Sequence, residues 1–126
     1  GLGLGLGLEV ISIPYYNFKE KLKDYVVKIN DLTKERDKDI RHYLFEGFGE
    51  GVGAWLEFTA LDRFEDVENA INEEEKPYFY RGFGRGIGYT FCEDLNRCAD
   101  LINKAEEKYR TFCRKGLSQA LDTLGL

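Results

Sequence analysis

The chain of 126 residues lacks several features that mark common classes of protein. It has no methionine, two prolines and one histidine, His42. None of its apolar runs approaches the roughly 20 residues that a transmembrane helix requires, so we expect no transmembrane segment. Basic residues are outnumbered, since 18 Lys and Arg stand against 23 Asp and Glu and the net charge is −5. This charge argues against nucleic acid as a partner, because nonspecific binding to phosphates needs an excess of Lys and Arg.

Cysteine is also scarce. Three cysteines cannot all pair within one chain, no two of them form a CxxC motif, and the single histidine lies far from them in the sequence. These spacings argue against a zinc finger and a c-type haem site. We expect Cys92, Cys98 and Cys113 to be buried and to pack as small apolar side chains. The alternative concerns Cys113, because the basic stretch 110–115 could lower the pKa of its thiol and make it reactive.

The chain has enough apolar surface for one folded domain, since 43% of its residues are hydrophobic and 14% are aromatic. It begins with GLGLGLGL, an alternation that would place every Leu on one face of an extended chain. We interpret residues 1–13 as an extended Gly-Leu arm or a linker. Residues 14–126 are interpreted as a single helical domain.

After the arm, apolar residues recur at three- and four-residue spacing, which predicts amphipathic helices. Asn17 has the form of a helix N-cap, and Pro77 suits the first turn of a helix. No convincing strand pattern follows the arm, so the predicted fold class is all-α with about six helices. The expected elements are 17–34, 38–58 and four helices that begin near Asp62, Pro77, Leu95 and Phe112.

The strongest pattern is an internal repeat of glycine-rich helices. Residues 43–53 read YLFEGFGEGVG, and residues 78–88 read YFYRGFGRGIG, so every glycine matches. A degenerate third copy begins near Phe112, with Gly116, Ser118 and Ala120 in the small positions. A unit of roughly 31–35 residues with two helices is typical of a helical-hairpin array. The expected copies are 38–75, 76–108 and 109–126.

With these units the chain resembles the tetratricopeptide-like class of helical repeats. Gly51 and Gly86 take the small position of that class in its first helix, and Ala70 and Ala105 match its late alanine. The pattern departs at Arg63, where a small residue is expected, and the early Trp and closing Pro of the class are missing. The resemblance implies a helical-hairpin architecture and a surface that binds other proteins.

The glycines within the two matched helices need an explanation, because each one costs about 1 kcal/mol relative to Ala in a helix. Glycines four residues apart lie on one line, where they let two helix backbones approach closely and gain dispersion and Cα–H···O contacts. We therefore expect the two glycine helices to face each other, within one chain or across a dimer interface. The glycines concerned are Gly47, Gly49, Gly51, Gly53, Gly82, Gly84, Gly86 and Gly88.

Charged residues beside the glycines change sign between the two copies. Glu46 and Glu50 of the first copy correspond to Arg81 and Arg85 of the second. We expect antiparallel packing, which would bring Glu46 near Arg85 and Glu50 near Arg81. Such pairs would set the register of the two helices more than their stability.

These motifs also partly resemble the signatures of nucleotide-binding, RNA-binding and metal-binding proteins, but none of these functions is favoured. GFGEGVG matches neither dinucleotide-binding nor P-loop signatures, and it follows a helical pattern rather than a strand. Arg81 begins an RGFG sequence that resembles the start of an RNA-recognition motif, but the next aromatic of that motif is replaced by Arg85. His42, Glu46 and Glu50, with Asp39 one turn earlier, could hold a metal on one helical face. With one histidine in the chain, a solvated or salt-bridged face is the favoured interpretation.

The sequence therefore predicts a non-catalytic protein-interaction or self-assembly module that uses glycine-striped helices with complementary Glu and Arg edges. Its expected partner is another protein or a second copy of the chain, and we expect no cofactor, metal site or catalytic residue. The alternative is a carrier of a small or hydrophobic ligand, or an enzyme subunit, with a pocket between the aromatic-rich helices. The two hypotheses differ in whether the chain meets a protein surface or a small molecule.

Overall fold

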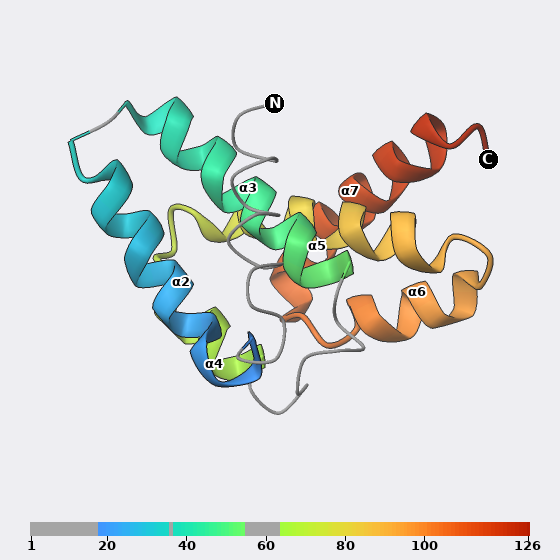
Figure 1. The fold of residues 1–126 in the computed structure, drawn as a ribbon. Coiled ribbons are helices and arrows are strands. Elements are labelled where there is room, and N and C mark those ends of the chain that lie inside the picture. The colour runs from blue at the N-terminus through green and yellow to red at the C-terminus, as the bar shows by residue number, and fades with distance from the viewer. Residues whose placement is uncertain (1–17, 36, 55–63) are drawn as a thin grey trace.

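A computed structural model of the chain describes residues 18–35, 37–54 and 64–126 (Figure 1). The described residues form six α-helices and one 3₁₀ turn, with no strand among them, so the all-α prediction is confirmed. The Gly-Leu arm, the capping residue Asn17 and the helix start at Asp62 lie outside the described residues. The helices are α2 (Phe18–Thr33), α3 (Lys38–Ala54), α4 (Phe64–Ala70), α5 (Lys76–Phe91), α6 (Leu95–Ile102) and α7 (Arg110–Thr123), and the 3₁₀ turn is η4 (Glu107–Tyr109).

Local sequence signals account for several of these helix boundaries. Pro77 lies in the first turn of α5, where its missing N–H is not needed for a helical hydrogen bond. Asp94 caps α6, because its side chain accepts a hydrogen bond of 3.0 Å from the backbone N–H of Arg97. Ala105 lies in a bend after that helix. In the described residues, no helix is long and apolar enough to span a bilayer.

Helix α5 lies between α3 and α7, and it packs along both of them (Figure 1). The three helices run in the same direction. On α5, Gly82 lies against Glu46 and Glu50 of α3, and Gly86, one turn later, lies against Glu50 and Ala54. The order is the same toward α7, where Gly84 meets Cys113 and Gly88 meets Leu117 and Ala120.

The expectation of antiparallel packing between the glycine helices is therefore wrong. Helices that follow one another directly along a chain usually run in opposite directions, but α4 intervenes between α3 and α5. Helix α5 begins at the end of the layer at which α3 begins, so it runs parallel to α3. The same holds for α5 and α7, because α6 lies between them in the sequence.

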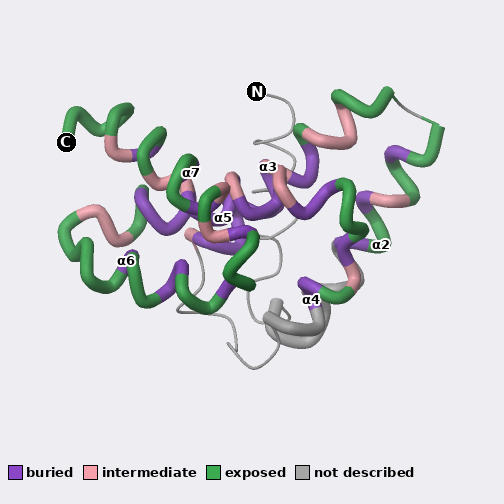
Figure 2. Tube along the Cα trace, turned by 180° about the vertical axis from the view of Figure 1, so that it is seen from behind, coloured by how far each residue is buried: buried purple, intermediate pink, exposed green. Residues whose placement is uncertain are grey.

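The core is aromatic and centres on α5. Burial is concentrated along α3, α5 and the inner side of α7, whereas α6 is mostly exposed (Figure 2). Phe48 of α3 contacts Phe79 of α5, with ring centroids 5.8 Å apart. Tyr80 is fully buried, stacks on Tyr109 with ring centroids 4.8 Å apart, and donates a hydrogen bond from its hydroxyl to Glu68. This core fixes the side of α5 opposite the polar residues described next.

Candidate functional site

The first component of the site is direct backbone contact between α3 and α5. A Cβ atom at Gly82 would lie within 3.0 Å of the backbone of Glu46 and Glu50, a separation that real Cβ atoms essentially never show. The neighbouring atoms are backbone, so they cannot move aside as the end of a flexible side chain could. Glycine is therefore required here for the two helices to keep their spacing. The other glycines that meet the backbone across this interface are Gly49, Gly53 and Gly86.

The second component is an equivalent contact between α5 and α7. A Cβ atom at Gly84 would collide with the backbone of Cys113, and one at Gly116 would collide with the backbone of Arg81 and Arg85. Gly88 differs, because its nearest neighbours are the side chains of Ala120 and Leu117. Of the eight glycines predicted to pack, six thus contact a neighbouring helix of the same chain. The remaining two, Gly47 and Gly51, are buried in α3.

The role of α7 follows from the spacing of the glycines, although the sequence analysis paired α3 with α5 alone. Residues two positions apart on a helix point about 200° away from each other. Gly82 and Gly86 therefore face α3, whereas Gly84 and Gly88 face the opposite neighbour, α7. Two stripes on one helix predict two neighbours, and Gly116 in the degenerate third copy marks the second of them.

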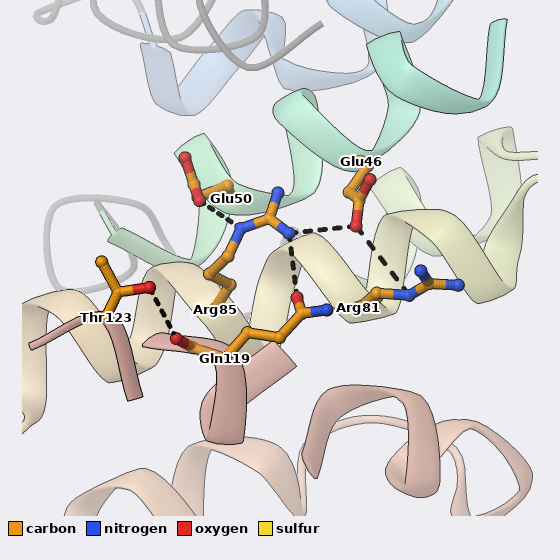
Figure 3. A network of polar contacts seen from close by, with 6 residues as sticks. All are labelled: Glu46, Glu50, Arg81, Arg85, Gln119 and Thr123. Atoms are coloured by element: carbon orange, nitrogen blue, oxygen red, sulfur yellow. Dashed lines mark hydrogen bonds and ion pairs between the residues drawn. The ribbon is translucent and has the colours of Figure 1, made fainter. Parts of the chain in front are cut away.

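Arg85 lies at the centre of the polar contacts that join the three helices (Figure 3). Its Nε donates a hydrogen bond of 2.5 Å to Oε1 of Glu50, and its Nη1 donates to Oε1 of Glu46 at 3.0 Å. The same Nη1 donates to Oε1 of Gln119 on α7 at 3.1 Å. Burial alone would lower the pKa of Arg85, but the hydrogen bonds and charges of Glu50 and Glu46 outweigh this effect and raise it. Arg85 is therefore held in its charged form.

The ion pairs between α3 and α5 differ from those predicted from the sequence in one respect. Glu46 does lie against Arg85, but Glu50 pairs with Arg85 and not with Arg81. Nε of Arg81 lies 3.8 Å from Oε1 of Glu46, an ionic contact too long for a hydrogen bond, and in the described part of the chain this buried Nε has no hydrogen-bond acceptor. We call Glu46, Glu50, Arg81, Arg85 and Gln119 together the charged edge.

Gln119 was missed by the sequence analysis, although a signal for it exists. It follows Gly116 by three residues, just as Arg85 follows Gly82 and Glu50 follows Gly47. The position is thus occupied by an acid, a base and an amide in successive units. A neutral amide can accept a hydrogen bond from Arg85 without adding a third carboxylate to the edge.

A pocket of about 330 Å³ opens beside the charged edge, between the N-terminal halves of α3 and α5. The rings of His42 and Tyr78 stack on each other in its wall, with centroids 3.9 Å apart and planes 9° apart. The guanidinium of Arg81 lies 5.6 Å from the centroid of the Tyr78 ring. The lining residues are Asp39, His42, Tyr43, Glu46, Tyr78 and Arg81.

These contacts also show how the candidate metal ligands are used. His42 stacks on Tyr78, and the carboxylates of Glu46 and Glu50 both bind Arg85. Within the described ranges, no group of three or more His, Cys, Asp or Glu side chains is arranged to hold a metal ion. The residues of this face therefore form ion pairs and a ring stack.

Cys113 is fully buried against α5. Burial raises the pKa of its thiol to about 12, and the opposing charges of Arg114 and Arg110 are too weak to reverse this shift. The hypothesis that the basic stretch activates this cysteine is therefore wrong. Its thiol serves as a small apolar group at the place where Gly84 lets α7 approach α5.

The cysteines should differ in reactivity toward iodoacetamide at pH 8. Cys92 is half-buried, whereas Cys98 and Cys113 are buried, and burial raises the pKa of both of these thiols. We expect Cys92 to be alkylated first and the other two to react only on the timescale of unfolding. Mass spectrometry of the labelled peptides measures this order. Labelling of Cys113 in the native protein as fast as Cys92 would contradict its burial.

Comparison of the chain with protein-family models, with curated proteins and with solved structures finds no match. The arrangement of α3, α5 and α7, with the charged edge and its pocket, is therefore the basis on which a function is inferred. It combines a closely packed helical layer with a polar, partly aromatic surface.

Proposed function

We propose that this chain is a non-catalytic protein-interaction module built from imperfect helical-hairpin repeats. The observation that carries the proposal is the contact of glycines with neighbouring backbone, which fixes three parallel helices in one layer. Side chains on the open side of such a layer have fixed spacing before a partner arrives. A preorganised surface loses less conformational freedom on binding, which favours affinity.

The glycine stripes themselves are not offered as the binding surface. Six of the eight glycines contact helices of the same chain, so a partner or a second copy could reach them only if the helices separated. This favours a partner that meets the layer from outside over self-assembly through the stripes. The charged edge then serves to hold α3, α5 and α7 in register beneath that surface.

The surface beside the pocket is the best candidate for partner contact. Tyr43 is 62% exposed there, although it is a large ring next to the closely packed layer. Tyrosine is among the residues enriched in interfaces and their energetic centres, because its ring is apolar and its hydroxyl can hydrogen-bond. The proposed surface comprises Tyr43 and the pocket that opens beside the charged edge.

A carrier of a small ligand remains the second candidate, and the pocket is the observation that favours it. Its volume of about 330 Å³ falls at the lower end of the range of ligand sites, roughly 300–1,000 Å³. A carrier would gain thermal stability from one class of compound in a screen. An interaction module would gain it from a partner protein instead.

Affinity capture with the full chain tests the proposal. Tyr43→Ser should reduce capture of the proteins that the wild-type chain retains by about fivefold or more, the effect of losing about 1 kcal/mol of binding free energy. Leu126→Ser is the matched control, because Leu126 is also exposed but lies at the C-terminus. Equal capture by wild type, variant and control would contradict the proposed surface. Light scattering on the same sample should give the monomer mass of 14.6 kDa, whereas a mass that grows with concentration would favour self-assembly.

A further inference from the structure

The pocket beside the charged edge carries an uncompensated negative charge. The four ionised residues of the charged edge, Glu46, Glu50, Arg81 and Arg85, contribute two negative and two positive charges and cancel. Asp39 adds one carboxylate to the pocket wall, and it forms no ion pair in the part of the chain that the structure describes. The pocket therefore has a local charge of −1 at neutral pH, which favours a cationic group as its occupant.

The rings of the pocket narrow the choice of cation. Tyr43 lies at the pocket wall and is mostly exposed, whereas the ring of Tyr78 already stacks on His42 and lies near the guanidinium of Arg81. A planar, delocalised guanidinium stacks on such rings and can also bind a carboxylate through two parallel N–H groups. A compact ammonium lacks this flat shape, so arginine fits this combination better than lysine.

The chain itself contains the same combination of partners for an arginine. The guanidinium of Arg41 lies 5.3 Å from the centroid of the Phe45 ring, while its Nε donates a hydrogen bond to the carboxylate of Glu75. Its remaining N–H groups bind Thr33 at 3.1 Å and Asn30 at 2.6 Å. A ring and a carboxylate thus hold a guanidinium at one place in the fold, and Tyr43 and Asp39 offer the same two kinds of partner at the pocket wall.

We propose that the pocket binds the guanidinium group of an arginine presented by a partner protein. Asp39 accepts its N–H groups, and the exposed ring of Tyr43 packs against one of its faces. The proposal rests on the proposed function for the protein source of the arginine. Among the described residues that line the pocket, Arg81 is the one like charge, and its contact with Glu46 partly neutralises it.

A short peptide with one arginine tests this site directly. The probe is acetyl-Gly-Gly-Arg-Gly-Gly-amide, and its control carries citrulline, which keeps the shape of arginine but is neutral. In an NMR titration of the full chain, we expect the arginine peptide to shift the signals of His42, Tyr43 and Tyr78. The citrulline peptide should bind about tenfold more weakly, because the charge-assisted hydrogen bonds to Asp39 are lost. Equal binding of the two peptides, or no binding at millimolar concentration, would overturn the proposal.

Two charge variants test whether the ligand of the pocket is a cation or an anion. Asp39→Asn should weaken the arginine peptide about tenfold, whereas Arg81→Gln should tighten it because a like charge is removed. Asp31→Asn on α2 is the matched control, with the same change of charge away from the pocket, and should leave binding unchanged. Loss of binding in Arg81→Gln would assign the pocket to an anion and overturn the inference. An unchanged amide spectrum shows that each variant is folded.

Two further outcomes separate this inference from the proposed function. If agmatine, a small guanidinium compound, binds more tightly than the peptide, the pocket binds a small molecule. The proposal that its ligand is an arginine of a partner protein is then wrong. If the arginine peptide does not bind while capture of proteins still depends on Tyr43, the proposed interaction function is supported and the proposed arginine site is wrong.

Discussion

Replacing Gly82 by alanine should destabilise the fold by about 3 kcal/mol, the upper part of the usual range for an overpacked core position. The new Cβ would collide with the carbonyl of Glu46 and lie within 3.0 Å of the backbone N of Glu50. Helices α3 and α5 would have to separate, with loss of contacts along both. This loss outweighs the gain of about 1 kcal/mol that alanine brings to an isolated helix. Urea unfolding followed by circular dichroism measures the change.

Gly88→Ala is the control for that substitution, because Gly88 lies in the same helix but faces side chains of α7 rather than the backbone of α3. Its nearest neighbours are side-chain atoms: the Cβ of Ala120 at 2.7 Å, which requires a small shift of α7, and the Cδ1 of Leu117 at 3.0 Å, whose side chain can rotate away. We expect Gly88→Ala to lower the free energy of unfolding by about 1 kcal/mol or less. A Gly82→Ala variant as stable as wild type would show that the backbones of α3 and α5 are not in contact.

Replacing Arg85 by alanine should have an effect of similar size, about 3–5 kcal/mol, because it removes the partner of a buried charge. Glu50 is only 3% exposed and accepts a hydrogen bond from Arg85. Without the guanidinium, its carboxylate would be left buried and unpaired, and both Glu46 and Gln119 would also lose a donor. Thermal and urea unfolding measure this loss.

Arg81→Ala provides the matched comparison one helical turn earlier. The side chain of Arg81 is 32% exposed, and its contact with Glu46 is an ionic one of 3.8 Å, so its loss should cost about 1 kcal/mol or less. A double variant, Glu50→Gln with Arg85→Gln, removes both charges and should recover most of the stability that Arg85→Ala loses. If Arg81→Ala and Arg85→Ala were equally destabilising, the central position of Arg85 would be wrong.

Helix positions followed closely from the sequence, because each depends on local periodicity and on boundary residues. Pro77 marked the start of α5, and the apolar spacing gave α2 to within a residue at each end. The glycine stripes also predicted that helices approach closely. These features are encoded within one helix at a time, so the sequence carries them directly.

The direction of the helices could not be obtained in this way. Glu46 and Arg85 can contact each other whether their helices run parallel or antiparallel, because long side chains one helical turn apart can reach the same partner. Arg85 binds both Glu46 and Glu50, whereas the sequence predicted one acidic partner for each arginine. The alternative hypothesis included a pocket between aromatic-rich helices, but its lining could not be predicted, because it forms only where Tyr78 of α5 comes to lie on His42 of α3. Burial likewise decides the state of Cys113, against the charge of its neighbours in the sequence.

The central claim is that glycine stripes hold α3, α5 and α7 in parallel within one chain. Nuclear Overhauser contacts from the Hα protons of the α5 glycines test it most directly, in a sample where labelled and unlabelled chains are mixed. The account predicts contacts from Gly82 to Glu46 and Glu50, and from Gly86 to Glu50 and Ala54, all within the same chain. Contacts in the reverse order, or contacts seen only between differently labelled chains, would contradict it.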